Sequence, residues 1–419
     1  MPASDLYQKK ECRYCGTRLP APFLDLGTIA LANSYVPVAN PPEEEFKCPL
    51  QTALCPSCAL VQLTHVVPPD LMFRNYFYVS STTQTFKAHF AEYAKTARKK
   101  LGKKTSPLAV DIGSNDGALL ALYQQEGMRA VGVDPATNLA REANVRGLRT
   151  FDRYFDASCV QEIITEFGKA DVISANNVFA HIDDIQSVCR NVFDLLDEEG
   201  IFVIEFPYLG TMLDKMYFDM IYHEHLSYIA VSPLQFLLSR FHMEIFDIQE
   251  VESHGGSLRI YIKKKSANRR IESIVTSYIQ EEKRRNFSSP SIYEEFARKV
   301  IKTKEELVSC IGEIKAEGKT VAGYGAPAKA STIVNFCELT NVQIDFIVDD
   351  NPMKQNNYVP GARIPIVSSQ HLEKNAPDYI LIFAWNFAKE ILSKIGHYSK
   401  RGTRFLVPLP HPDEIIPHP

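Results

Sequence analysis

The chain has 419 residues, which is too long for one hydrophobic core of ordinary size, so we expect two or three domains. Hydrophobic residues make up 45% and charged residues 23%, a composition typical of folded soluble proteins. The formal net charge of −4 argues against a nucleic-acid partner, although it is compatible with a local basic pocket for a diphosphate.

Nothing in the composition indicates a membrane or a secreted protein. No apolar run approaches the roughly 20 residues that a membrane-spanning helix needs, and the charged start has no apolar stretch behind it. The nine cysteines are odd in number and scattered, unlike a disulfide framework. We therefore expect a cytoplasmic protein with no membrane partner, and a monomer is the working expectation.

Two CxxC pairs near the start predict a structural zinc site. Each CxxC turn directs two thiolates at one point, and two such turns complete a tetrahedral Zn²⁺ shell. The predicted ligands are Cys12, Cys15, Cys55 and Cys58. Four protein ligands leave no position for a reactive water, so this zinc should fold residues 1–70 without doing chemistry. The alternative is a group of reduced, buried cysteines.

Residues 108–117, LAVDIGSNDG, are an apolar run that ends in Asp111 and leads through a glycine turn into an apolar helical stretch. A second apolar run ends in Asp134 about twenty residues further on. This order of strand, turn, helix, strand and acid predicts a nucleoside-binding Rossmann half. The turn is not GxGxxG, and it resembles motif I of the class I methyltransferases instead. Residues 170–185 and 196–207 resemble the fourth and fifth strands of that fold. A Rossmann domain for another nucleoside is the alternative.

Residues 222–225 read Tyr-His-Glu-His, four ionisable side chains in a row. Chance on a surface and a metal site are two interpretations, but HxH without further placed ligands is a weak metal signal. General base catalysis is the third. A sugar carbon must lose a proton beside a carbonyl before it can be methylated, and histidine is suited to that task.

The pattern of strand, glycine turn and helix starts again after residue 300, at GYGAPAKAST. It predicts a second Rossmann-like unit, in which Lys329 and the helix start could neutralise a diphosphate. Residues from about 260 to 315 are charged and predict a solvated, helix-rich connector. The alternative is a C-terminal domain used only for packing.

Taken in order, these motifs resemble one family over nearly the whole chain: S-adenosylmethionine-dependent C-methyltransferases that act on dTDP-linked 4-keto deoxysugars. The resemblance also rests on YFYVSSTTQTFKAHF (76–90), NNVFAHI and HGGSLR (254–259). It implies an α/β protein with a class I methyltransferase Rossmann-like domain over 71–265. A zinc-binding domain over 1–70 and a Rossmann-like nucleotide-sugar domain over 266–419 would flank it.

The resemblance also implies roles for individual residues. Residues that bind S-adenosylmethionine would be Asp111, Gly113, Asn115, Asp116, Gly117, Asp134, Asn176, Tyr76 and Phe155, the last with an ordinary core role as its alternative. Catalytic residues would be His225, Tyr222, Glu224 and His181, with the base either His225 or Tyr222. Contacts to the nucleotide sugar would come from Tyr78, Asn177, His254, Gly255, Arg259, Tyr324 and Lys329.

Three other functions compete with this interpretation. An O-methyltransferase would need no base matched to carbon acidity. A nucleotide-sugar epimerase or dehydratase would carry a TyrxxxLys pair and a dinucleotide GxxGxxG, neither of which occurs here. A non-catalytic zinc-knuckle protein would not need the intact glycine turn. Carbon 3 and carbon 5 of the sugar both stay open as the site of methylation.

Overall fold

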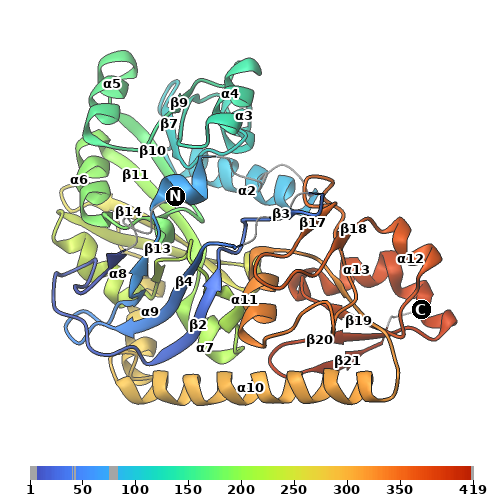
Figure 1. Ribbon diagram of the computed structural model, residues 1–419. Helices are drawn as coiled ribbons and strands as arrows, with labels where there is room; N and C mark the ends of the chain where they lie inside the picture. The colour runs from blue at the N-terminus through green and yellow to red at the C-terminus, as the bar shows by residue number, and fades with distance from the viewer. Residues whose placement is uncertain (1–6, 40, 42–43, 75–83, 417–419) are drawn as a thin grey trace.

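The computed structural model describes residues 7–39, 41, 44–74 and 84–416. Strands of the N-terminal region lie beside both a large sheet and a smaller C-terminal sheet (Figure 1). The predicted α/β class with two Rossmann-like sheets and a small N-terminal domain is therefore confirmed. Among the described residues, every helix is too short or too polar to span a lipid bilayer.

The N-terminal region is a set of short antiparallel strands. β2 (Leu24–Ala30), β4 (Lys47–Leu54) and β5 (Val61–Leu63) form a sheet whose fourth member, β12 (Ser227–Tyr228), comes from far along the chain. β1 (Tyr7–Gln8) pairs with β6 (His65–Val66), and β3 (Val36–Pro37) pairs with β17 (Asn357–Tyr358) of the C-terminal domain. Helix α1 (Pro69–Phe73) follows. The small domain is thus tied by strand pairing to both larger ones.

The large sheet has seven strands in the order β13-β14-β11-β10-β7-β8-β9. Its parallel strands are β7 (Leu108–Ile112), β8 (Arg129–Asp134), β9 (Thr150–Asp152), β10 (Ala170–Asn176) and β11 (Leu196–Pro207). β13 (Met243–Val251) and β14 (Ser257–Lys264) complete it as antiparallel strands. All five residues of β7 are buried because helices cover both faces of the sheet.

Helices divide between those two faces. On one face α2 (Gln84–Lys100), α3 (Ala118–Gln125) and α4 (Thr137–Val145) share a core with Ala109 of β7. On the other face α5 (Ala157–Phe167) and α6 (Ile185–Leu195) share a core with its neighbour Val110. The alternation along β7 follows from the two-residue period of a strand.

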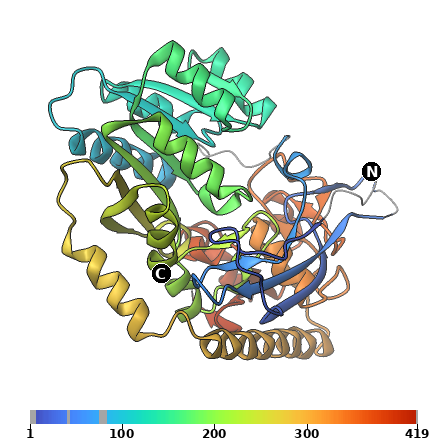
Figure 2. The same ribbon diagram turned by 90° about the vertical axis from the view of Figure 1, so that its left-hand side faces the viewer.

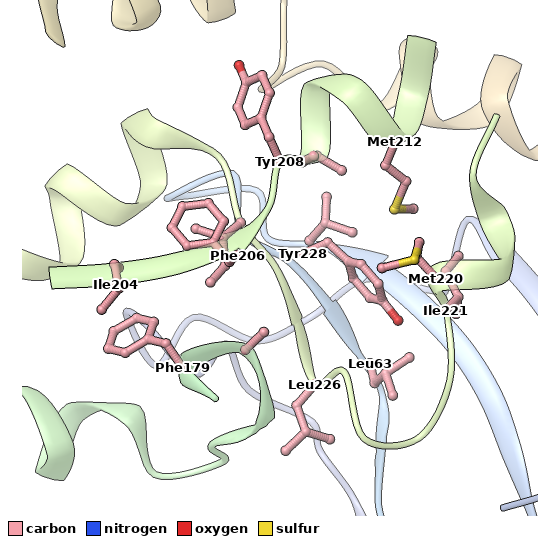
Figure 3. Packing of buried hydrophobic residues seen from close by; sticks show 14 of the residues in the cluster. Leu63, Phe179, Ile204, Phe206, Tyr208, Met212, Met220, Ile221, Leu226 and Tyr228 are labelled. Atoms are coloured by element: carbon pink, nitrogen blue, oxygen red, sulfur yellow. The ribbon is translucent and has the colours of Figure 1, made fainter. Parts of the chain in front are cut away.

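The segment between β11 and β13 carries the tetrad. It contains α7 (Leu209–Asp214), the short helix η4 (Phe218–Met220), β12 and α8 (Val231–Ser239). Met220 and Ile221 before the tetrad and Leu226 after it are buried, close to Leu63 of β5 (Figure 3). The tetrad therefore lies in a well-packed loop. Two further short helices are η3 (Phe179–His181) and η5 (Ser253–Gly255).

The connector consists of α9 (Ser273–Arg284) and α10 (Pro290–Ala316), and α10 runs along the base of the molecule (Figure 2). The prediction of a solvated connector is wrong for one side of α10. Tyr293, Phe296 and Val300 form a buried stripe that continues through Leu307 and Ile311. Their spacing of three, four, seven and four residues places them on one face of a helix, which packs against the core.

The C-terminal sheet has six strands in the order β18-β16-β15-β19-β20-β21. They are β15 (Val321–Tyr324), β16 (Ile347–Val348), β18 (Ile366–Val367), β19 (Tyr379–Ile382), β20 (Arg404–Val407) and the antiparallel β21 (Asp413–Ile415). Its helices are α11 (Ala328–Phe336), α12 (Gln370–Lys374), η6 (Trp385–Phe387), α13 (Ala388–Ile395) and η7 (Gly396–Arg401). This is the second Rossmann-like unit that the sequence predicts.

Candidate active site

The four predicted zinc ligands converge. The sulfur atoms of Cys12, Cys15, Cys55 and Cys58 all lie within 4.8 Å of one another. Backbone bonds from Gly16 N to Cys12 O and from Ala59 N to Cys55 O close the two turns. Cys48 lies in a separate apolar cluster with Leu31 and Val67. The donor set is closed and fits a structural Zn²⁺.

One cavity of about 1540 Å³ joins the large sheet to the C-terminal domain. At one end it is lined by the glycine turn after β7 and by the ends of β8 and β10. Tetrad residues line its middle, and the glycine turn after β15 lines its other end. Both turns follow the carboxyl ends of parallel strands, where ligands of open α/β sheets bind.

At the first end, the turn needs a glycine at position 113. Gly113 lines the cavity at φ +70°, and a Cβ there would lie 2.3 Å from Cγ2 of Val178. Asp134 holds the same turn, because its carboxylate accepts hydrogen bonds from Asn115 N at 2.7 Å and Ala136 N at 2.8 Å. Burial raises the pKa of Asp134 above its ordinary value. The residues predicted to bind the cofactor that line this end are Gly113, Asn115, Asp134, Phe155 and Asn176.

Asp111, Asp116 and Gly117 lie behind the turn, outside the cavity wall that the described residues form. Asp111 is buried and accepts a hydrogen bond from Ser174 Oγ at 2.5 Å, and burial raises its pKa to about 7. A Cβ on Gly117 would lie 2.7 Å from Leu148. These residues shape the turn from behind, and their predicted contact with the cofactor stays a prediction.

Asn176 ends β10 at the cavity, and its side-chain nitrogen and oxygen are both buried without a hydrogen-bond partner among the described residues. Asn177 beside it lines the cavity in the left-handed conformation, and its side-chain oxygen is also unpartnered among those residues. Buried polar atoms normally have partners, so unsatisfied atoms on a cavity wall are typical of a site where a ligand binds.

The tetrad splits into two pairs. Tyr222 and His225 line the cavity, and the Tyr222 hydroxyl lies 2.6 Å from Nε2 of His225. Nδ1 of His225 lies 2.8 Å from the carbonyl oxygen of Met220. A carbonyl only accepts, so Nδ1 carries the proton and Nε2 accepts the bond from Tyr222. The ring of His181, also on the cavity wall, is 5.1 Å from that of His225.

The other two tetrad residues lie outside the cavity wall. His223 is buried and donates from Nε2 to the carbonyl of Cys48 at 3.0 Å, and burial lowers its pKa to about 4. Glu224, predicted to contact the sugar, accepts a hydrogen bond from Asn33 at 2.5 Å. Asn33 itself lines the cavity, and the predicted contact of Glu224 with the sugar stays a prediction.

At the other end, Tyr324 and Lys329 line the cavity as predicted. The Lys329 ammonium is buried, 4.0 Å from the ring of Trp385, and donates to Asn386 at 2.7 Å. Burial lowers the pKa of Lys329 to about 8. The Tyr324 hydroxyl donates to Asp350 at 3.1 Å. α11 starts immediately after Pro327, where a proline is suited to precede a helix.

Gly255 and Arg259 do not belong to the cavity wall formed by the described residues, and their predicted contact with the sugar stays a prediction. The strand register places Arg259 of β14 opposite Glu205 of β11, and the two form a buried ion pair at 3.1 Å. A Cβ on Gly255 would lie 2.8 Å from Trp385, which stacks on Tyr217. Both residues therefore have a role in packing. Tyr76, Tyr78 and the side chain of His254 lie outside the described residues.

Some residues of the site were missed by the sequence analysis. Asn33 and Lys354 line the cavity, and Trp385 covers the ammonium of Lys329. None of the three lies in a motif that could have marked it. Phe387, near Trp385, lines the same end.

Comparison with known proteins gives three family matches along the chain: a zinc binding domain over residues 12–73, a methyltransferase domain over 86–245 and a C-methyltransferase C-terminal domain over 252–410. The chain is 36% identical to C-methyltransferase NovU of Streptomyces niveus over 402 residues, 96% of each protein.

Among solved structures, the chain is similar to the magnesium protoporphyrin IX methyltransferase ChlM of Synechocystis PCC 6803. The identity is 13% and the TM-score 0.33, over 44% of this chain and 86% of ChlM. It is also similar to an S-adenosylmethionine-dependent methyltransferase of Clostridium acetobutylicum ATCC 824. There the identity is 14% and the TM-score 0.34, over 44% of this chain and 93% of the other.

Proposed function

Because the chain belongs to the family of S-adenosylmethionine-dependent C-methyltransferases with a zinc-binding domain, we propose that its substrate is a nucleotide-linked keto sugar. The preferred form is a dTDP-4-keto-6-deoxy sugar, methylated on a carbon beside the ketone. One observation carries the proposal: a single cavity joins the Gly113 turn, the Tyr222–His225 pair and Lys329.

Methylation at carbon needs a group that removes a proton, and the Tyr222–His225 pair can do this. Nε2 of His225 has its lone pair directed at Tyr222, because Nδ1 donates to Met220. Once substrate enters, Nε2 is the atom that would take the proton from carbon, directly or through the Tyr222 oxygen. His225 therefore ends as the proton holder in either arrangement.

The negative charge that develops on the substrate's ketone oxygen must be stabilised. His181 is placed near His225, and the amide of Asn177 faces the same cavity. Donors held in place before reaction stabilise an enediolate oxygen without reorganisation. Bound S-adenosylmethionine would supply an electrophilic methyl group beside the Gly113 turn.

The nucleoside diphosphate would occupy the C-terminal end. Lys329 lies one residue inside the start of α11, so its charge and the first free N–H groups of the helix act at the same place. Burial of the ammonium makes negative charge beside it favourable: Asp219 supplies one such charge, and a diphosphate would add to it.

The test uses two histidines of the same tetrad. In His225→Asn the amide can still donate to Met220 in place of Nδ1, but the base at Nε2 is lost. His223→Gln is the matched control, because its amide can replace the Nε2 donor to Cys48 away from the cavity.

Both variants and the wild type would be incubated in deuterated water with the keto sugar, with and without S-adenosylmethionine. We expect His225→Asn to lose C-methylation and exchange of the adjacent proton by at least about a hundredfold, the usual contribution of a general base. His223→Gln should retain both. A methyl group on oxygen, or full activity in His225→Asn, would instead favour an O-methyltransferase.

A further inference from the structure

The three residues before the tetrad loop, Asp219, Met220 and Ile221, are held from two sides. We infer that the C-terminal domain positions the His225 base through Trp385 and Thr332, which fix the ends of this three-residue segment. The inference rests on the proposed role of His225, and it assigns positioning residues to a domain that the proposal uses only for the nucleotide.

Each of the three residues makes one contact that matters. Trp385 Nε1 donates to the Asp219 carboxylate at 2.6 Å. The Met220 carbonyl accepts the proton of His225 Nδ1 at 2.8 Å. The hydroxyl of Thr332 donates to the Ile221 carbonyl at 2.9 Å. The Met220 carbonyl, which binds the His225 ring, thus lies between two residues that hydrogen-bond to the C-terminal domain.

Burial makes the loss of any of these hydrogen bonds costly. Asp219, Ile221 and Thr332 have no exposed surface, so water cannot replace a lost partner. Among the described residues, Trp385 is the side chain that donates a hydrogen bond to the Asp219 carboxylate, whose second oxygen has no side-chain partner. Phe218, immediately before Asp219, packs edge-on against Phe336 of α11, with 5.5 Å between the ring centres.

The same elements reach the nucleotide end of the cavity. Lys329 lines the cavity and lies three residues before Thr332, one turn away on α11. Trp385 covers the Lys329 ammonium at 4.0 Å while its nitrogen bonds Asp219. A diphosphate drawn to Lys329 would therefore act on the helix and the ring that together hold the segment beside His225.

Position of the Met220 carbonyl matters for catalysis because it fixes both the tautomer and the direction of the imidazole. A displacement of about 1 Å in a reacting group can cost about a hundredfold in rate. Loss of the hydrogen bond from Thr332 or Trp385 should therefore lower kcat and leave KM nearly unchanged. If these residues served packing alone, their loss would lower the stability of the protein without this specific effect on kcat.

The variants are Thr332→Val, which keeps the shape and removes the donor, and Thr332→Ser, which keeps the donor. Thr403→Val is the matched control: Thr403 is also buried and donates to a backbone carbonyl, that of Pro377 at 2.8 Å, within the C-terminal domain and away from His225. Trp385→Phe removes the donor to Asp219 and retains an aromatic ring on Tyr217.

We expect Thr332→Val and Trp385→Phe to lower kcat by about ten- to a hundredfold, with KM for both substrates within about twofold of wild type. Thr332→Ser and Thr403→Val should stay within about threefold in kcat. Equal losses in Thr332→Val and Thr403→Val, or a loss confined to KM, would overturn the inference.

A second readout does not depend on turnover. With ¹⁵N-labelled histidine, the ring-nitrogen shifts of His225 report its tautomer. Addition of dTDP alone should shift these resonances in wild type and Thr403→Val, and the shift should be lost in Thr332→Val. An unchanged response in Thr332→Val would refute the coupling even if His225 is the base. A coupled response together with an active His225→Asn would refute the proposed base and leave the coupling standing.

Discussion

Gly113 offers a prediction whose size can be worked out from its surroundings. Gly113→Ala introduces two separate costs: a left-handed backbone at φ +70°, and a Cβ 2.3 Å from Cγ2 of Val178. The left-handed conformation costs about 1–2 kcal/mol for a residue with a Cβ. Overpacking against Val178, which is partly buried, costs about 1–3 kcal/mol more. Together they predict a loss of about 2–5 kcal/mol in the free energy of unfolding.

Gly127 provides the matched control, because it has nearly the same φ, +74°, and a Cβ there would meet nothing within 4 Å. Gly127→Ala should show only the backbone cost of about 1–2 kcal/mol. Adding Val178→Ala to Gly113→Ala should recover the packing part and leave the backbone part.

Urea denaturation would measure the free energy of unfolding, and titration calorimetry would measure the affinity for S-adenosylmethionine. Gly113→Ala should weaken that affinity by about tenfold or more, since part of the strain would be relieved by moving the turn. Gly127→Ala should bind normally. Equal stability losses in the two single variants would refute the reasoning, because they would show that contact with Val178 has no cost.

Three further predictions concern other parts of the molecule. Arg259→Ala should lower the free energy of unfolding by about 1.5–3 kcal/mol, because it removes one charged partner of the buried Glu205 carboxylate, which His89 and the Ser253 hydroxyl still contact. Urea denaturation would measure the change, and a loss below about 1 kcal/mol would contradict the prediction. Cys58→Ser should bind less than one zinc ion per chain, as measured by atomic emission, and its N-terminal region should unfold before the other domains. A full zinc content in this variant would contradict the predicted ligand set. Lys329 must be protonated to attract a diphosphate, so affinity for dTDP should fall as pH rises through about 8, where its pKa lies. Lys329→Met should bind weakly at every pH, and an unchanged slope would contradict the assignment.

The features predicted well from sequence are those formed by neighbouring residues. A CxxC pair places its two thiols together whatever surrounds it, and the four sulfurs do converge. The glycine turn after β7 likewise needs only the strand, Gly113 and the acid at the end of the next strand. Both are local and could be read without knowing the fold.

Direction of side chains was harder to predict. His223 and His225 are two residues apart in a loop, and only tertiary packing turns one toward Cys48 and the other toward the cavity. Arg259 was expected at the substrate only because HGGSLR resembles a family motif, whereas strand register places it opposite Glu205 in a buried ion pair. Register between strands distant in sequence is not visible in either strand alone.

Contacts between domains could not be predicted at all. Asn33 reaches Glu224 across 191 positions, and Trp385 reaches Asp219 across 166. Neither asparagine nor tryptophan has a spacing pattern that marks such a partner. The prediction for α10 was wrong for a related reason: its charged residues are conspicuous, while the few buried residues are widely spaced along a helix of 27 residues.

The central claim is that the Tyr222–His225 pair removes a proton from carbon. The most direct test measures exchange of the proton beside the ketone, by NMR in deuterated water, with the dTDP-4-keto-6-deoxy sugar and without the methyl donor. We expect the wild type and His223→Gln to catalyse the exchange, and His225→Asn to lose at least about a hundredfold in its rate. Exchange at the wild-type rate in His225→Asn would contradict it.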